Sequence, residues 1–151
     1  MGEREQFEAR FREIQPKFSR LYGHLLAEAN LTLPQFTLLA QLIGRRTMSM
    51  TEVSSHLHVS KPAVTNLVDR LEENGYLKRL AHPEDRRVFL LEVEAKGERV
   101  VRSMQARGLE LLLKVFDQFN TKEQKVISSF YQLLSEKMDE MLMQLPKKAT
   151  L

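Results

Sequence analysis

Residues 60–66, with the sequence SKPAVTN, combine small, polar and basic side chains at the start of a predicted helix. Small side chains permit close approach to another molecule, and a helix N-terminus attracts phosphate through its unpaired backbone N–H groups. Lys61, Thr65 and Asn66 can hydrogen-bond to phosphates or to base edges. An ordinary solvated helix face is the alternative for this stretch taken alone. The chemistry that these side chains favour is recognition of a nucleic acid.

A second basic group lies in the stretch HPEDRR, between the short runs YLKRLA and VFLLEV. Both runs are typical of strands, so Arg86 and Arg87 are predicted at the tip of a β-hairpin. An arginine at such a tip can enter the minor groove of DNA, where the negative potential attracts it. Asp85 can orient one of the two by a charge-assisted hydrogen bond. A charged tip without a partner is the alternative, and it becomes less favoured beside a helix-turn-helix.

Three capped helices must position these side chains. Thr32 with Gln35, and Ser49 with Glu52, form two capping boxes, and Ser60 is a third N-cap. The last two helices are separated by a tight turn at residues 58–60, which is typical of a helix-turn-helix. With the hairpin over residues 76–93 as its wing, the stretch from about 49 to 93 is predicted to be a winged helix-turn-helix.

The third helix has two different faces. Its apolar positions, Val64, Leu67, Val68 and Leu71, share one side. The opposite side carries Pro62, Thr65, Asn66, Asp69 and Arg70. Phosphates would repel Asp69 and Glu73, so we expect this helix to enter a groove by its N-terminal end, with its C-terminal half held away.

The flanking segments are predicted to be long helices. Apolar residues from Phe7 to Leu25 recur every three or four positions and form one seam, interrupted by Pro16. Such a seam is an interaction surface or packs on the chain's own body. A helix from about 95 to 119 follows the hairpin, and a last helix, capped by Asn120 with Glu123 or by Thr121 with Gln124, runs to Leu145 and ends at Pro146. The predicted divisions are residues 1–31, 32–93 and 94–151.

The order of these elements, with VSKPAVTNLVDRLEENGYLKR and DRRVFLLEVEAKG at its centre, resembles the MarR/SlyA family of bacterial and archaeal transcriptional regulators. The resemblance covers essentially the whole chain. It implies a homodimer in which the first and last two helices interlock, bound to double-stranded DNA at a near-palindromic operator. It also implies that Arg87 is the wing arginine and Asp85 its orienting partner. The residues that it assigns to the recognition helix are Ser60, Lys61, Pro62, Thr65, Asn66 and Arg70.

Two positions depart from the family pattern. Glu94 stands where relatives usually have threonine, and glutamate is a weaker helix N-cap. Asn66 stands where many relatives have arginine. Because asparagine suits adenine and arginine suits guanine, Asn66 shifts the expected operator toward A·T pairs.

The family's usual input is a small-molecule effector, held in a cleft between the dimer helices and the DNA-binding lobe. Candidate residues are Phe18, Tyr22, Phe36 and Met104, for each of which a place in the core is the favoured alternative. The chain has no cysteine, and its four histidines show no ligand spacing, so we expect no metal and no cofactor. We see no catalytic motif and no membrane segment, and expect a cytoplasmic protein that is not an enzyme.

The sequence therefore predicts a mainly α protein, with a winged helix-turn-helix DNA-binding lobe, a small β-hairpin wing and a helical dimerisation lobe. Its expected function is that of a dimeric, sequence-specific transcriptional regulator. The family's usual action is repression of promoter access, relieved by the effector. Two alternatives remain at this point: a winged helix used for protein contacts, and a ligand-binding dimer without DNA binding.

Overall fold

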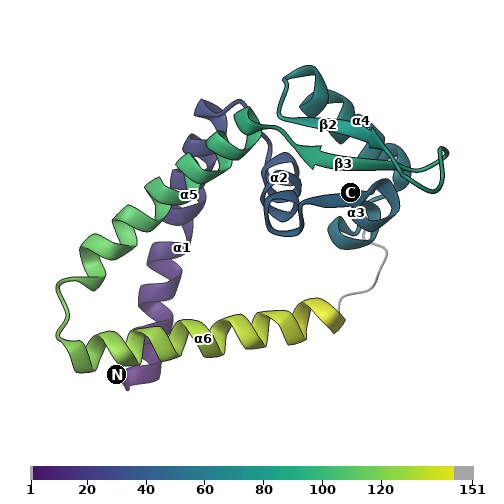
Figure 1. Cartoon of the computed structure of the whole chain (residues 1–151). Helices are drawn as coiled ribbons and strands as arrows, with labels where there is room; N and C mark the ends of the chain where they lie inside the picture. The colour runs from purple at the N-terminus through teal and green to yellow at the C-terminus, as the bar shows by residue number, and fades with distance from the viewer. Residues whose placement is uncertain (1, 145–151) are drawn as a thin grey trace.

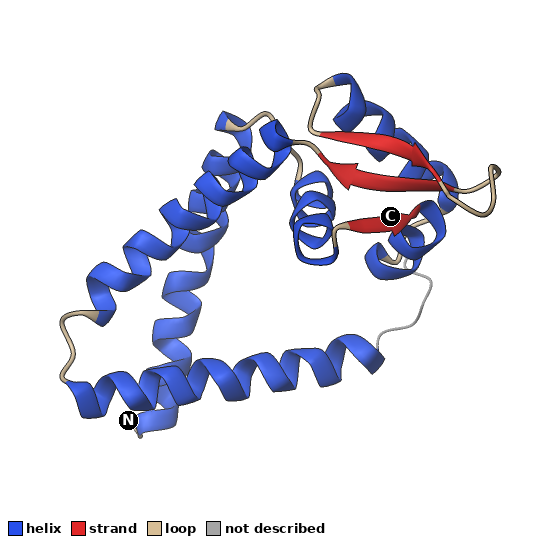
Figure 2. Ribbon diagram, viewed as in Figure 1, coloured by secondary structure: helices blue, strands red, loops and turns tan. Residues whose placement is uncertain are grey.

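The computed structural model describes residues 2–144 and consists mainly of helices with one small sheet (Figure 1, Figure 2). In chain order the elements are α1 (Glu3–Glu28), α2 (Leu33–Arg45), β1 (Thr47–Ser49), α3 (Met50–Leu57), α4 (Lys61–Glu73), β2 (Leu77–Ala81), β3 (Phe89–Val93), α5 (Ala95–Phe116) and α6 (Thr121–Gln144). The predicted mainly α fold with a helix-turn-helix and a hairpin wing is confirmed. The expected end of the last helix at Leu145 and Pro146 lies outside the described residues.

The predicted capping boxes fix the starts of α2 and α3. The Thr32 backbone N–H donates to the Gln35 side chain at 2.8 Å, and Thr32 Oγ1 accepts from the Gln35 backbone at 3.4 Å. Ser49 and Glu52 make the same reciprocal pair at 2.6 and 3.2 Å. Because these bonds satisfy backbone donors that a helix start leaves unpaired, they set where each helix begins.

The two long C-terminal helices differ in whether a side chain caps their first turn. At α6 the structure selects one of the two predicted boxes: Asn120 Oδ1 accepts from the Glu123 backbone at 3.2 Å, and Glu123 accepts from the Asn120 backbone at 2.8 Å. At α5 the N-cap is Glu94, whose side chain makes no capping hydrogen bond. The weaker cap expected from glutamate is thus present.

The sheet has three antiparallel strands in the order β1-β3-β2. The predicted hairpin pairs Leu77 with Val93 and Ala81 with Phe89. The strand β1 was not predicted; it pairs with the other edge of β3, placing Met48 opposite Leu91. Three residues are too few to show an alternating pattern, and β1 directly precedes the capping box at Ser49.

The hydrophobic core lies among α2, α3, α4 and the sheet, and the inner parts of α1 and α5 close it. Its largest fully buried side chains are Leu25, Leu38, Leu39, Leu42, Met48, Leu71, Leu77 and Leu91. We call residues 32–93, which supply most of this core, the winged-helix region. Its interior fixes how α4 and the wing are presented.

Tyr76 joins the winged-helix region to both long helices beside it. Its hydroxyl donates to the Ala29 carbonyl at the end of α1, at 3.3 Å. Its carbonyl accepts from the Glu94 backbone at 2.9 Å, just before α5. A Cβ atom at Gly97 would lie 2.2 Å from the same carbonyl oxygen, so only glycine permits this approach. Three chain segments therefore meet at one tyrosine.

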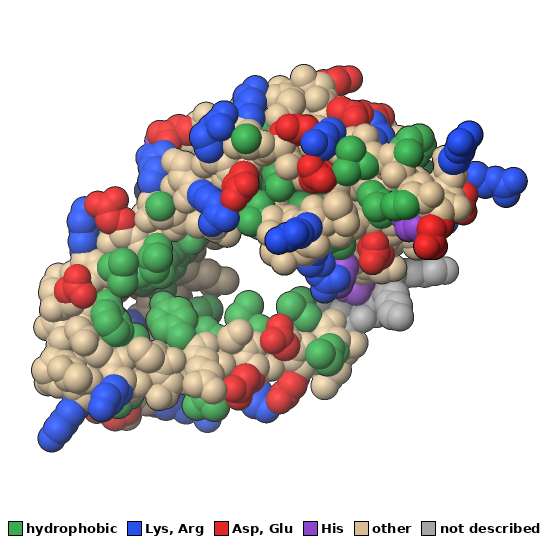
Figure 3. All heavy atoms as spheres, in the orientation of Figure 1, with side chains coloured by type: hydrophobic (Ala, Val, Ile, Leu, Met, Phe, Trp, Pro, Cys, Tyr) green, Lys and Arg blue, Asp and Glu red, His purple; other side chains and the backbone are tan. Residues whose placement is uncertain are grey.

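The outer helices have far less packing of their own. Figure 1 shows α5 leaving the sheet and α6 turning back from its far end. No described residue of α6 is buried. The predicted seam on α1 divides: Leu25 belongs to the core, whereas Phe7, Phe11 and Ile14 are exposed. We call residues 3–15, 109–116 and α6 the helical arm; Figure 3 shows apolar side chains gathered between these helices.

Candidate nucleic-acid interface

The N-terminal end of α4 is presented to solvent by a buried opposite face. Val64, Val68 and Leu71 are buried in the core, whereas Ser60, Lys61, Pro62, Thr65 and Asn66 are exposed. Ser60 Oγ accepts from the Ala63 backbone at 3.4 Å, as expected of an N-cap. The predicted side chains therefore lie together on the first turns of one helix.

These side chains differ in the hydrogen-bonding capacity that remains to them. Thr65 Oγ1 donates to the Lys61 carbonyl at 3.1 Å, so its hydroxyl remains an acceptor. Within residues 2–144, Lys61 and Asn66 have no side-chain partner. The Asn66 amide can thus offer a donor and an acceptor together, which is what the major-groove edge of adenine requires.

Arg70 lies further along α4, away from this cluster. It is exposed and lines a pocket of about 450 Å³ beside the α1–α2 connection, together with Asn74 and Gln35. The structure thus places Arg70 at the opposite end of the helix from Ser60. It brings the other five recognition-helix candidates together.

The wing is the connection between β2 and β3, and it projects from one end of the molecule (Figure 1). Arg86 and Arg87 are both exposed there, and basic side chains extend from this end in Figure 3. Asp85 Oδ1 accepts from the backbone N–H of Arg87 at 2.9 Å. Asp85 therefore orders the backbone that carries Arg87 through a charge-assisted hydrogen bond.

Arg79, on β2, is a residue near this surface that the sequence argument did not single out. Its guanidinium group forms ion pairs with Asp69 and with Glu72, both on α4. Its backbone N–H also donates to Glu72 Oε1 at 3.2 Å. Burial alone would lower the pKa of Arg79, but the hydrogen bond with Asp69 and the charge of Glu72 raise it, so the pairs hold a charged arginine. The sequence feature that could have indicated this pairing is an arginine in the strand that directly follows the acidic end of α4.

Comparison with known proteins bears on this arrangement directly. Residues 31–89 match the family model described as MarR family. Over these residues the chain is similar to members of the MarR family. The matched residues include the whole helix-turn-helix and the wing tip, so the family match covers the candidate interface itself.

Other known proteins are similar to this chain in sequence or in fold. It is 29% identical over 99 residues to the uncharacterized HTH-type transcriptional regulator YsmB of Bacillus subtilis, over 66% of this chain and 68% of YsmB. The transcriptional regulator Tm0710 of Thermotoga maritima is 28% identical, with a TM-score of 0.69 over 93% of this chain and 99% of Tm0710. A structure of the S. aureus MepR-DNA complex is 18% identical, with a TM-score of 0.70 over 85% of this chain and 96% of MepR, and it shows the fold alone.

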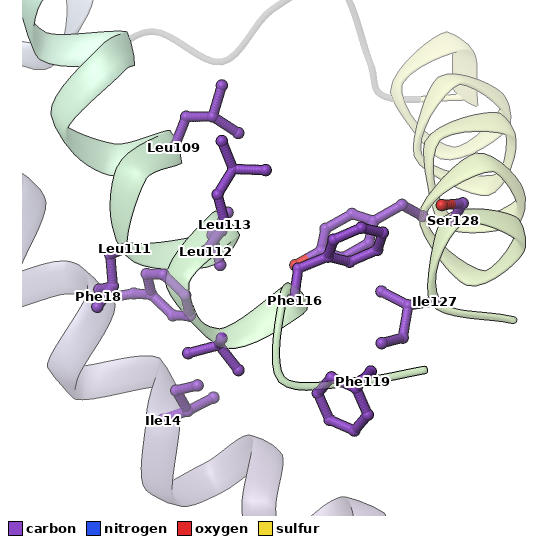
Figure 4. Close-up of a pocket in the computed structure, with 12 residues that line it drawn as sticks. Ile14, Phe18, Leu109, Leu111, Leu112, Leu113, Phe116, Phe119, Ile127 and Ser128 are labelled. Atoms are coloured by element: carbon purple, nitrogen blue, oxygen red, sulfur yellow. The ribbon is translucent and has the colours of Figure 1, made fainter. Parts of the chain in front are cut away.

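The four effector candidates do not meet in one cavity of the described residues. Phe18 lines an apolar groove of about 550 Å³ formed by α1, α5 and α6, where Ile14, Phe116 and Ile127 face one another (Figure 4). Tyr22 is partly exposed, with its ring centroid 6.5 Å from that of Phe18. Met104 is buried in the core, and Phe36 is partly buried and packs against the core.

The described residues also lack two other features, a cluster of metal ligands and a membrane-spanning helix. Within residues 2–144, no group of three or more histidine, aspartate or glutamate side chains is arranged to hold a metal ion. In the same range, no helix combines the length and apolar character needed to cross a bilayer.

Proposed function

We propose that this chain is a dimeric, sequence-specific DNA-binding transcriptional regulator. The observation that carries the proposal is the exposed N-terminal end of α4, with Lys61, Thr65 and Asn66 available beside the capped Ser60. The exposed arginines of the wing supply a second basic contact at the end of the same region. The MepR structure, which shares this fold, is described as a DNA complex and supports the same use of the surface.

The two contacts have different roles in this proposal. The first turns of α4 enter a major groove, where Asn66 contacts adenine and Lys61 contacts phosphate. Arg87 enters the neighbouring minor groove, whose width and negative potential it detects. Arg70 makes a further contact from the far end of α4. Sequence preference therefore comes mainly from Asn66, and the wing adds affinity.

Two copies are needed to read a near-palindromic operator. The exposed apolar residues of the helical arm, such as Phe11 and Leu133, are the surface that a second copy covers. A two-fold dimer places its recognition helices about one helical turn, roughly 34–36 Å, apart. The proposed division is a winged-helix DNA-binding lobe over residues 32–93, with dimerisation helices on either side.

Regulation is proposed to act through the spacing of the two α4 helices. The protein is proposed to act in the cytoplasm. In the DNA-bound state the dimer represses transcription by blocking access to a promoter. A small-molecule effector relieves repression by binding better to a state in which the helices are spread, because equal affinity for both states would shift nothing. Of the proposed effector residues Phe18, Tyr22, Phe36 and Met104, Phe18 lines the apolar groove and Tyr22 lies beside it, so these two are the first to test.

Binding-site selection from random duplex DNA tests the proposal, followed by affinity measurements across a salt series. Arg87→Ala should weaken binding to all sequences and reduce the salt slope by about 1, whereas Asn66→Ala should cost about 1–3 kcal/mol mainly at adenine positions. Arg99→Ala is the control, because Arg99 is an exposed arginine on α5.

Three results would contradict this function. Failure to enrich any sequence would indicate a ligand-binding dimer without DNA binding. Binding to a protein partner that persists at high salt, without DNA binding, would indicate a protein-interaction module. Equal and sequence-independent losses from Arg87→Ala and Asn66→Ala would contradict the division of roles between the helix and the wing.

A further inference from the structure

The C-terminal half of the recognition helix carries a charge problem for any protein that binds phosphate. Asp69 and Glu72 are three residues apart on α4 and therefore lie on the same face. Both side chains remain partly exposed, at 47% and 39%. Without a partner they would repel the DNA backbone beside the groove that α4 enters, because like charges at close range are unfavourable.

Arg79, on the strand β2 that leads into the wing, pairs with both carboxylates. Its side chain is only 22% exposed, less than either of its partners, and its two terminal nitrogens pair with the two acids separately. The backbone N–H of Arg79 adds a third bond, to Glu72. A planar guanidinium group can bind two carboxylates in fixed directions, which the single ammonium group of lysine cannot.

We propose that Arg79 is a positioning residue that clamps the wing to the recognition helix and screens the acids of α4 from DNA. This inference rests on the proposed function. The strand β2 runs directly into the wing, so a bond from Arg79 to the helix fixes the wing relative to α4. The clamp sets the separation between the side chains on the first turns of α4 and Arg87, and the two contacts reach adjacent grooves in register.

The same clamp changes how closely the acidic C-terminal half of α4 can approach DNA. The sequence alone suggests that Asp69 forces this half away from DNA. With Asp69 and Glu72 both paired to Arg79, their combined charge falls from −2 to −1, so the repulsion is reduced and the helix can lie closer to the backbone. Glu73 is exposed and its side chain has no partner within residues 2–144, so its repulsion of phosphate is not reduced.

The first test neutralises the charges of the clamp and measures the affinity for the selected operator and for a scrambled duplex. We expect Arg79→Gln to weaken operator binding by about tenfold, because charged hydrogen bonds are lost, with the salt slope unchanged. Asp69→Asn with Glu72→Gln should weaken operator binding in the wild type, because the clamp is lost, but should recover part of the affinity in the Arg79→Gln background, because the unscreened acids are removed. Arg79→Lys should fall between, and Arg99→Gln is the charge-matched control.

A second measurement reads the clamp without DNA. Because the chain has no cysteine, cysteines introduced at Glu73 on α4 and Glu84 in the wing can carry two spin labels. Pulsed electron paramagnetic resonance should give a narrow distance distribution in the wild type and a broader one in Arg79→Gln. Thermal unfolding of each variant confirms that it is folded; if Arg79→Gln does not fold, Arg79→Lys and the double acid variant carry both measurements.

The outcomes separate the clamp from the proposed function. An unchanged distance distribution, or wild-type operator affinity in Arg79→Gln, overturns the clamp while DNA binding by the wild type stands. A salt slope reduced by about 1, with no recovery in the triple variant, assigns Arg79 a direct phosphate contact instead. A wild-type protein that binds no duplex overturns the proposed function, and the screening role with it, whatever the distances show.

Discussion

The winged-helix region and the helical arm are both rich in apolar residues, but they use them in opposite ways. In the first, Leu38, Leu42 and Leu91 have no exposed surface. In the second, Leu133 is 60% exposed and no described residue of α6 is buried. The winged-helix region thus has an interior of its own, whereas the arm has an apolar surface whose partner must come from elsewhere.

The two regions differ in how far their stability depends on assembly. Removing apolar surface from water contributes about 25 cal/mol per Å², and contiguous exposed apolar patches mark interaction sites. The winged-helix region obtains this stabilisation within one chain. The arm obtains it only when another molecule covers Phe11, Phe130 and their neighbours, and we propose a second copy of this chain.

The largest expected effect sets matched leucines of the two regions against each other. Leu91→Ala should lower the free energy of unfolding by about 2–5 kcal/mol, because it leaves a cavity in a closed core. Leu133→Ala should change it by less than about 0.5 kcal/mol at protein concentrations low enough for the monomer. Denaturant unfolding of both variants measures the contrast, and equal losses would mean that the arm also has an interior.

A charge in the arm should affect association and leave the winged-helix region folded. Phe130 packs edge-on against Phe7, with ring centroids 5.9 Å apart, yet remains 45% exposed. We expect Phe130→Glu to raise the dimer dissociation constant by at least about tenfold, as for other buried aromatic anchors. Sedimentation equilibrium measures the constant, with circular dichroism as the check on folding.

Gln132→Glu is the control for this variant, because it adds the same charge on the polar side of α6. Loss of association in both variants would point to net charge as the cause. Unchanged association in Phe130→Glu would place the dimer interface elsewhere.

The smallest expected effect is a pH dependence at the start of α3. Hydrogen bonds from the Ser49 backbone and side chain hold the pKa of Glu52 below its ordinary value of 4.5. A carboxylate with a lowered pKa in the folded state stabilises it above the unfolded value, and that stability is lost as pH falls through the folded pKa. Glu52→Gln should therefore flatten the decline of the melting temperature below about pH 4.5.

Glu136→Gln, in the arm, is the comparison for this titration, because Glu136 lies on exposed α6, outside the winged-helix region. An equal flattening in both variants would show that general charge loss, and not the capping box, causes the pH dependence. Thermal unfolding from pH 6 to pH 3 distinguishes the two.

Local signals explain why so much of the winged-helix region could be predicted from the sequence. The boxes at Thr32 and Ser49 and the cap at Ser60 each involve residues only three apart, so the sequence shows both partners. The hairpin was visible because its strands are separated by a charged turn. The family resemblance, confirmed by the match over residues 31–89, rests on the same short-range patterns.

What the sequence did not show depends on residues that folding brings together. The pairing of Arg79 with Asp69 crosses from a strand to a helix, and no spacing rule connects those two positions. The strand β1 exists because β3 offers an unpaired edge, which no local pattern records. Phe18 and Met104 were grouped by residue type, but the packing of α1 and α5 places one in a groove and the other in the core.

The contacts of Tyr76 bear on how portable the winged-helix region is. A fragment of residues 32–93 would lose the Ala29 carbonyl and the Glu94 amide that bond to this tyrosine, and the Gly97 backbone that covers its carbonyl. Each of these hydrogen bonds contributes a net stabilisation of about 0.5–1.5 kcal/mol. Transplanting this region onto another protein would therefore require the end of α1 and the first turn of α5 to travel with it.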